Sequence, residues 1–207
     1  MALRRKDIER VLTRVPPHPK PRADLEQVMT PPEIAADVVF EAFALGDIGG
    51  RFVLDLGCGT GMLSIAAGLM GAMPVYGFDI DEQAIALART AAREAGVSQA
   101  EFDVMDVSDM GQLEAHTVLC NPPFGAQKRH ADRPFIDAAA SAGEVCWTFH
   151  LASTRDWVVA RIGELGGTVT HELPFRFPIA AQHYFHDKPV RDVDVVVLRW
   201  TGPRAGS

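Results

Sequence analysis

Two short motifs in this chain could together perform chemistry on a nitrogen atom. One is Asn121-Pro122-Pro123-Phe124, which directly follows an apolar run. The other is a glycine-rich turn of sequence Asp-Leu-Gly-Cys-Gly-Thr-Gly at 55–61. The first motif suits a planar amine, and the second suits a nucleoside cofactor. Together they predict the transfer of a methyl group to a nitrogen.

The Asn-Pro-Pro-Phe motif offers two hydrogen-bond acceptors and a flat surface. The side-chain oxygen of Asn121 and the backbone carbonyl of Pro122 could accept the two N–H groups of an aromatic amine. Pro122 and Pro123 fix the backbone, and Phe124 provides a face on which a base could stack. We therefore predict that these four residues hold the methyl acceptor. No metal is predicted, because direct displacement depends mainly on alignment.

The glycine spacing favours one class of cofactor. Gly57-x-Gly59-x-Gly61 differs from the G-x-G-x-x-G pattern of dinucleotide folds, and no G-K-[ST] follows to hold a triphosphate. A nucleoside that carries an amino acid fits better, so S-adenosyl-L-methionine is the predicted cofactor. A dinucleotide-dependent oxidoreductase is the alternative. Asp79 could accept hydrogen bonds from both ribose hydroxyls, and Asp106 could accept one from the adenine amine.

The elements that must hold these motifs alternate along the chain. Apolar segments of strand type alternate with segments of helical periodicity from Phe52 onward. This order predicts an α/β fold with a seven-stranded, mostly parallel sheet and helices on both faces. With the Asn-Pro-Pro-Phe motif, the chain resembles the class I methyltransferases, which have a Rossmann-like fold. The predicted strands are 52–56, 75–79, 100–104, 117–120, 145–151, 168–173 and 193–199, the last two forming an antiparallel pair. The predicted helices of this part are 62–70, 82–95, 136–142 and 154–165.

The amino-terminal part is predicted to add two helices. Apolar residues recur at helical spacing from Ile8 to Val15, and a proline-rich link follows. We interpret residues 1–24 as an amphipathic helix and a spacer that precede one domain, 25–207, of a size suited to a single core. The second helix is predicted to begin at Thr30-Pro31-Pro32-Glu33, with Thr30 as the N-cap and Glu33 completing a capping box.

Composition and charge limit the functional classes. A net charge of −7 argues against a protein that coats nucleic acid by bulk electrostatics. The three cysteines are odd in number and lack C-x-x-C spacing, so neither a disulfide framework nor a zinc site is predicted, and a reducing cytoplasm is the expected location. The sequence contains no run of about 20 apolar residues, so no membrane segment is predicted.

A base must leave its stack to enter a pocket of the predicted kind, which is easiest in an unpaired or irregular region. Structured single-stranded RNA is therefore a natural target. Basic residues at Lys128 and Arg129 follow the Asn-Pro-Pro-Phe motif and are candidate RNA contacts. His186 is a third candidate, although a loop that closes onto the core explains it almost as well.

Several segments, which reach from about Leu25 to Leu198, resemble a small family of ribosomal-RNA adenine N6-methyltransferases of eukaryotes and archaea. The matching segments are Leu25-Glu26-Gln27 with Thr30-Pro31, Asp55 to Gly59, Gly77 to Glu82, Asn121 to Gly125, Ser153-Thr154-Arg155 and Tyr184-Phe185-His186. Asn-Pro-Pro-Phe alone does not identify the acceptor, since DNA, RNA and protein-glutamine methyltransferases share it. The flanking segments narrow the resemblance.

The resemblance implies a cofactor pocket, a substrate and a partner. With the motifs above, it gives the candidate cofactor residues Gln27, Thr30, Asp55, Gly57, Gly59, Thr60, Gly61, Met62, Asp79, Ile80, Asp106 and Val107. It also implies that adenine lies against residues 121–124, and that the target is one adenosine of small-subunit ribosomal RNA. A small zinc-binding activator protein would form a heterodimer by adding to the sheet edge near Ala100–Val104.

Two other functions remain open at this point. The same Asn-Pro-Pro-Phe motif could grip a carboxamide, as in a glutamine N5-methyltransferase that acts on a release factor. A chain of this kind could also be a non-catalytic RNA-binding scaffold stabilised by S-adenosylmethionine, although an intact motif argues against loss of activity.

Overall fold

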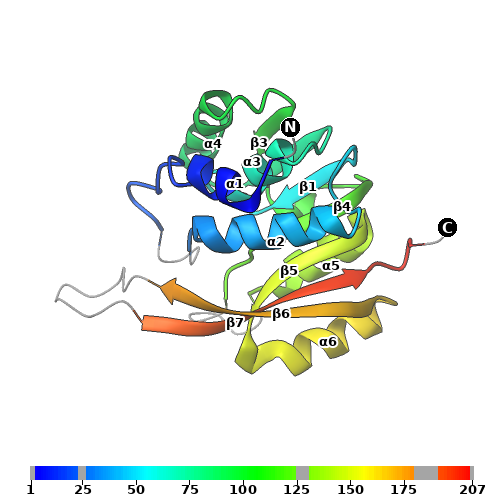
Figure 1. Ribbon diagram of the computed structural model, residues 1–207. Coiled ribbons are helices and arrows are strands. Elements are labelled where there is room, and N and C mark those ends of the chain that lie inside the picture. Colours follow the sequence, from blue (N-terminus) through cyan, green and yellow to red (C-terminus); the bar gives the residue numbers. More distant parts are fainter. Residues whose placement is uncertain (1–2, 23–26, 125–130, 180–190, 206–207) are drawn as a thin grey trace.

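The computed structural model describes residues 3–22, 27–124, 131–179 and 191–205 of the 207-residue chain. One seven-stranded sheet has the strand order β3-β2-β1-β4-β5-β7-β6 (Figure 1). Five strands are parallel: β1 (Val53–Leu56), β2 (Val75–Asp79), β3 (Ala100–Val104), β4 (Ala115–Cys120) and β5 (Gly143–Leu151). β7 (Arg191–Thr201) is antiparallel to both of its neighbours, β5 and β6 (Thr168–Ile179). The predicted fold class is confirmed.

The described part of the chain contains six α-helices, which cover the sheet on both faces. One hydrophobic cluster packs helices from the first half of the chain, and a second cluster packs those that follow β4. The first group comprises α1 (Arg5–Leu12), α2 (Pro32–Ala44), α3 (Met62–Leu69) and α4 (Glu82–Glu94). The second comprises α5 (Arg133–Ala142) and α6 (Arg155–Glu164). The sheet is therefore buried between two helical layers, which explains why its central strands are apolar on both sides.

The amino-terminal helix is part of the core. Ile8 and Leu12 on α1 have no exposed surface, and Arg5 forms a 2.8 Å ion pair with Asp37 on α2. These contacts fix the point from which the proline-rich link departs toward the carboxyl ends of the parallel strands, on the left of Figure 1. Within the described residues, no helix has the length and apolar character needed to cross a bilayer.

The capping arrangement predicted for α2 is wrong. The helix begins at Pro32 with Pro31 as its N-cap, and no side chain caps it. A proline at the first helical position has no N–H group to satisfy, so a hydroxyl cap is less needed there. The Thr30 hydroxyl instead accepts a 3.0 Å hydrogen bond from the side-chain amide of Asn121.

The closing strand pair is longer than the sequence predicts. β6 continues to Ile179, beyond the predicted end at residue 173, and it includes Pro174 and Pro178. β6 is an edge strand with β7 as its paired neighbour. Proline is tolerated at such an edge because a missing N–H group need not break the ladder.

Candidate active site

A cavity of about 430 Å³ lies at the carboxyl ends of β1, β2 and β4. Its walls come from the turn after β1, the end of β2, the loop after β3, the motif after β4 and the amino-terminal link. Ligands of open parallel sheets bind at this edge, where loops diverge and helices begin. The volume is within the range of small-molecule and cofactor sites.

Most of the predicted cofactor residues line this cavity. They are Gln27, Thr30, Asp55, Gly57, Gly59, Thr60, Met62, Asp79, Ile80, Asp106 and Val107. Gly61 is not among the lining residues. It precedes α3 with a φ of 89°, and a Cβ atom there would lie 3.2 Å from the Ala88 side chain. We therefore assign Gly61 to the close packing of α3 against α4 and not to cofactor contact.

The glycine-rich turn presents its backbone to the cavity. Gly59 has a φ of 54°, and a Cβ atom at this position would meet nothing within 4 Å. The left-handed conformation, not crowding by protein atoms, therefore calls for glycine here. The Gly59 N–H donates to the Asp79 carboxylate at 2.8 Å, which joins the turn after β1 to the end of β2.

Asp55, at the end of β1, is buried with only half of its carboxylate satisfied. One oxygen accepts hydrogen bonds from the backbone N–H and the hydroxyl of Ser64, at 2.9 and 2.6 Å. The other oxygen, Oδ1, has no hydrogen-bond partner. Burial raises the pKa of Asp55 to about 7, and the Ser64 hydrogen bonds act in the opposite direction. The carboxyl group is thus poised between its neutral and ionised forms near neutral pH.

Two aspartates at the end of β2 form a second polar wall. Asp79 accepts from the backbone N–H groups of Gly59 and Asp81, at 2.8 and 2.9 Å. Burial nevertheless raises the pKa of Asp79. Asp81 caps α4 by accepting from Gln83, and it also accepts a 2.8 Å hydrogen bond from the Gln27 side chain. Each Asp79 oxygen can accept a further hydrogen bond. The binding of ribose hydroxyls by Asp79 therefore stays a prediction.

Asn121, at the end of β4, is held in one orientation. Its amide nitrogen donates to the Thr30 hydroxyl at 3.0 Å and to the Val28 carbonyl at 3.3 Å. Because two acceptors fix the nitrogen, the side-chain oxygen takes the opposite direction. That oxygen is buried without a hydrogen-bond partner, and Asn121 lines the cavity.

The other residues of the motif differ in their surroundings. Pro123 lines the cavity, but Pro122 and Phe124 are not among the lining residues. Phe124 is 8% exposed, and its ring lies edge-on to Phe177 with centroids 5.7 Å apart. In this conformation Phe124 belongs to the core, because a distant strand supplies an aromatic partner that the motif cannot reveal. The stacking of a base on Phe124 therefore stays a prediction.

Four buried side-chain atoms within the described residues lack a hydrogen-bond partner, and all four residues line the cavity. The atoms are Nε2 of His18, Oδ1 of Asp55, Oγ1 of Thr60 and Oδ1 of Asn121. Buried polar groups in native proteins are nearly always paired. The concentration of unpaired atoms in one cavity therefore marks a site for a polar ligand. An adenosyl group with an attached amino acid supplies donors and acceptors that suit this set.

Sequence reasoning missed two walls of the cavity. Pro17, His18 and Pro21 come from the link that was interpreted as a spacer. Phe135, near the start of α5, lies over the glycine turn, where a Cβ atom on Gly57 would come within 3.0 Å of its ring. No local motif marks these residues, since they reach the cavity through long-range packing.

The remaining predictions concern the RNA contacts, the cysteines and the absence of a metal site; of the cysteines, Cys58 lines the cavity. The candidate RNA contacts Lys128, Arg129 and His186 lie outside the described residues. All three cysteines, Cys58, Cys120 and Cys146, are buried and free. No group of three or more potential metal ligands gathers in the described parts of the chain.

Comparisons with known proteins agree with this geometry. The family model of ribosomal protein L11 methyltransferase (PrmA) matches residues 40–122, less than half of the chain. A solved structure from Pyrococcus horikoshii, provisionally described as an RNA methyltransferase, superposes with a TM-score of 0.90 at 34% identity. That alignment covers 98% of this chain and 99% of the other.

Two relatives with full-length similarity carry a specific description. The rRNA N(6)-adenosine-methyltransferase Mettl5 of Drosophila melanogaster is 35% identical, with 96% of each chain covered. The corresponding protein METTL5 of Danio rerio is 32% identical, with 95% of this chain and 98% of the relative covered. A magnesium protoporphyrin IX methyltransferase with the same fold, at 21% identity and a TM-score of 0.64, has S-adenosylmethionine bound in its solved structure. By these similarities, the present chain belongs to the family of rRNA N(6)-adenosine-methyltransferases.

Proposed function

We propose that this protein transfers the methyl group of S-adenosylmethionine to N6 of an adenosine in ribosomal RNA, most specifically RNA of the small subunit. The observation that carries the proposal is the orientation of Asn121. Its nitrogen is tied to Thr30 and Val28, and its buried oxygen is left without a partner at the cavity. An exocyclic amine supplies the N–H donor that this oxygen lacks.

The residues of the motif would act by holding the amine. When bound, S-adenosylmethionine supplies an electrophilic methyl group on a sulfonium that departs as a neutral thioether. Asn121 accepts one N6–H through its side-chain oxygen, and the Pro122 carbonyl accepts the other. Two such hydrogen bonds favour the pyramidal nitrogen whose lone pair attacks the methyl carbon. Asn121 is neutral and cannot take up the proton, so the nitrogen loses it to water after transfer.

The extent of the two kinds of similarity favours RNA over protein as the substrate. The match to the ribosomal protein L11 methyltransferase model ends at residue 122, so it covers the cofactor turn and stops within the acceptor motif. The relatives named for rRNA adenosine methylation match from end to end, including the region after β4. The region after β4, which would contact the methyl acceptor, is thus similar to that of the rRNA adenosine methyltransferases.

The proposal predicts N6-methyladenosine as the product. The purified protein is incubated with labelled S-adenosylmethionine and unmodified small-subunit RNA, and the RNA is digested to nucleosides for mass spectrometry. Matched incubations contain a release factor in place of RNA. Label in N6-methyladenosine supports the proposal. Label in glutamine of the release factor would replace it with the protein-directed reaction, and cofactor binding without any transfer would favour the scaffold.

We also propose that a small zinc-binding activator protein pairs with the edge of β3, in the cytoplasm. β3 is an edge strand with β2 as its paired neighbour, and Val104 at its end is 50% exposed. Strand addition at such an edge would satisfy its outward backbone groups. Val104→Asp should weaken the complex in calorimetry, whereas Leu45→Asp, which alters an exposed residue beyond α2, should not. Equal affinity of both variants would place the partner elsewhere.

A further inference from the structure

The proline-rich link between α1 and α2 forms one wall of the cofactor cavity. Pro17, His18 and Pro21 line that wall. The segment is anchored on one side by the buried residues of α1, and on the other by a 2.7 Å hydrogen bond from the Arg22 N–H to the Gln27 side chain. Prolines restrict the backbone between these anchors. The link is therefore held in place against the cavity.

The His18 ring presents a hydrogen-bond donor for which the described residues supply no acceptor. Its side chain is 10% exposed, and Nδ1 accepts a 3.2 Å hydrogen bond from the Lys20 N–H. A neutral imidazole whose Nδ1 is an acceptor carries its proton on Nε2. Nε2 is buried and forms no hydrogen bond. A buried donor without an acceptor is costly, which points to an acceptor supplied by a ligand.

The nearby carboxylate does not fulfil this need. Oδ2 of Asp81 lies 3.4 Å from His18 Nε2, within the range of an ion pair, but the two atoms form no hydrogen bond. The same oxygen already accepts from Gln27, and the other oxygen of Asp81 caps α4. Asp81 also donates its backbone N–H to Asp79, so His18 stands beside the aspartate pair that ends β2.

We propose that His18 is a cofactor-binding residue whose Nε2–H donates to a ribose oxygen of the adenosyl group. Ribose hydroxyls both donate and accept, so one sugar can donate to the carboxylate of Asp79 and accept from the imidazole of His18. The link from 16 to 22 then covers the nucleoside half of the cofactor. This inference rests on S-adenosylmethionine as the cofactor in the proposed function.

Calorimetry with the full chain tests the inference without measuring turnover. S-Adenosylhomocysteine is titrated into the wild-type protein, His18→Ala and His18→Gln, with His171→Ala as the matched control. His171 is an exposed histidine on β6. Loss of one hydrogen bond should weaken binding about fivefold to tenfold in His18→Ala. His18→Gln, which keeps a donor, should lose less, and His171→Ala should match the wild type.

A second ligand identifies the contacted half of the cofactor. 5′-Methylthioadenosine has the ribose and adenine but no amino acid. His18→Ala should weaken its binding by the same factor as that of S-adenosylhomocysteine. An unchanged affinity for methylthioadenosine would overturn the ribose contact.

Melting temperatures without ligand should agree among all four proteins. If the wild type binds and His18→Ala binds equally well, the inference fails while the cofactor assignment stands. If the wild type does not bind S-adenosylhomocysteine, both fail. A ligand-free melting temperature that falls in His18→Ala and also in His18→Gln would assign His18 a structural role instead.

Discussion

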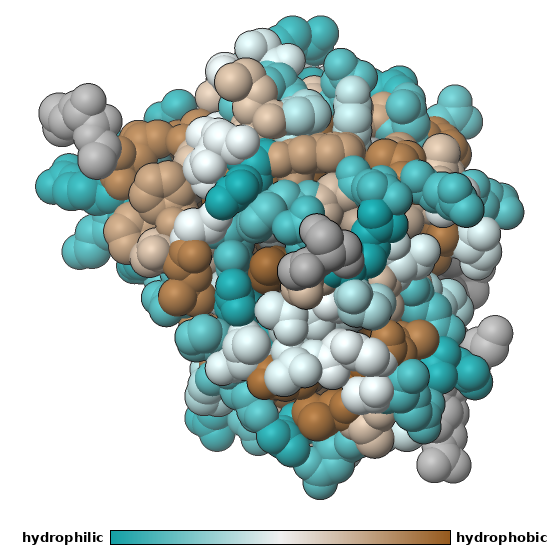
Figure 2. Space-filling model, turned by 90° about the vertical axis from the view of Figure 1, so that its right-hand side faces the viewer, coloured by the Kyte–Doolittle hydropathy of each residue, from teal (hydrophilic) through white to brown (hydrophobic). Residues whose placement is uncertain are grey.

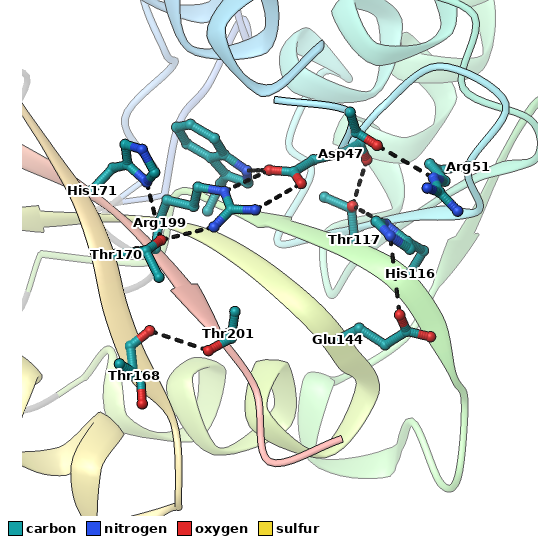
Figure 3. Close-up of polar contacts among 12 residues, drawn as sticks. Asp47, Arg51, His116, Thr117, Glu144, Thr168, Thr170, His171, Arg199 and Thr201 are labelled. Atoms are coloured by element: carbon teal, nitrogen blue, oxygen red, sulfur yellow. Dashed lines mark hydrogen bonds and ion pairs between the residues drawn. The ribbon is translucent and has the colours of Figure 1, made fainter. Parts of the chain in front are cut away.

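Two buried aspartates have different environments: Asp47 lies in the loop before β1, and Asp55 lies near the carboxyl end of β1. Asp47 is 3% exposed and fully paired: its carboxylate accepts two hydrogen bonds from Arg199 and one from the Trp147 indole, while its backbone carbonyl accepts from Thr117 (Figure 3). Asp55 is 1% exposed, but one of its oxygens has no partner. Both carboxylates are buried, so burial alone does not separate structural from functional residues.

The two ends of the sheet differ in whether their buried polar groups find hydrogen-bond partners among the described residues. The Asp47 cluster ties the loop before β1 to β5 and β7, and its hydrogen bonds are complete within the protein. Figure 2 looks onto this end of the molecule and shows largely hydrophilic and neutral residues, with hydrophobic atoms in separate groups. At the other end, the unpaired atoms converge on one cavity. The paired groups around Asp47 stabilise the fold, whereas the unpaired atoms at the cavity are available to form hydrogen bonds with a ligand.

The largest expected effect is on stability, from Asp47→Ala. This change leaves the guanidinium of Arg199, 13% exposed, without its carboxylate, and it leaves the Trp147 N–H unpaired. Removing one partner of a buried ion pair should lower the free energy of unfolding by about 3–5 kcal/mol. Urea denaturation measures the loss, and the folded fraction should bind S-adenosylhomocysteine normally. A loss below about 1 kcal/mol would show that the cluster is not structural.

Asn121→Ala should give the opposite pattern. Stability should fall less than in Asp47→Ala, because removal of a buried oxygen without a partner offsets part of the loss of the hydrogen bonds to Thr30 and Val28. Methyl transfer should fall at least about a hundredfold, because the amine is no longer aligned. Single-turnover assays measure the transfer, and calorimetry should show retained cofactor binding. Unchanged turnover would contradict the role of Asn121.

The titration of Asp55 should link cofactor binding to pH. Its pKa is raised from 3.8 to about 7, so the ligand-free folded protein holds a proton that the unfolded chain releases between these values. The contribution of Asp55 to stability is therefore lost as the pH rises through this window. The ammonium of S-adenosylhomocysteine should favour the ionised carboxylate. Affinity should accordingly rise roughly tenfold from pH 6 to pH 8, as one protonation linkage gives.

Asp55→Asn provides the control for this pH dependence. The variant cannot ionise, so its affinity for S-adenosylhomocysteine should be nearly constant between pH 6 and pH 8. If the variant keeps the full pH dependence in calorimetry, another group is responsible.

A pair of matched substitutions gives the smallest and sharpest contrast. Thr117 donates to the Asp47 carbonyl and shares a hydrogen bond with His116, whereas the Thr60 hydroxyl has no protein partner. Thr117→Val should lower the free energy of unfolding by about 1–2 kcal/mol. Thr60→Val should leave stability unchanged or slightly higher, and it should weaken S-adenosylhomocysteine binding a few-fold. Thermal melts measure the stability of both variants, and calorimetry measures their affinity for S-adenosylhomocysteine. Equal losses of stability in Thr117→Val and Thr60→Val would contradict the proposed difference between the two ends of the sheet.

Much of this molecule follows from local sequence patterns. The alternation of strand-type and helical periodicity predicts the sheet and its helices, because each element buries one face or both with a regular repeat. The glycines of the turn at 55–61 predict the place of the cavity, because glycine adopts a positive φ without steric cost and lets the backbone approach a ligand. All three glycines of this turn have a positive φ. Asn121 is marked by its place after an apolar strand.

The failures share one cause, which is contact between residues far apart in the chain. Thr30 was expected to cap α2, but it accepts a hydrogen bond from a residue 91 positions later. The edge-on contact of Phe124 with Phe177 on β6 was also not expected, while the stacking of a base on Phe124 stays a prediction. Neither partner is visible within a local window.

The order of elements, the cofactor class and the acceptor motif could be predicted from the amino-acid sequence, because these depend on short-range spacing and on the chemistry of individual side chains. Which polar atoms remain unpaired depends on how the folded chain packs. That packing occupied the amide nitrogen of Asn121 and left the oxygen unpaired, and it brought His18 from the amino-terminal link to the wall of the cavity. Pairing of polar groups is a property of the packed chain, since every hydrogen bond made in one place withdraws a donor from another.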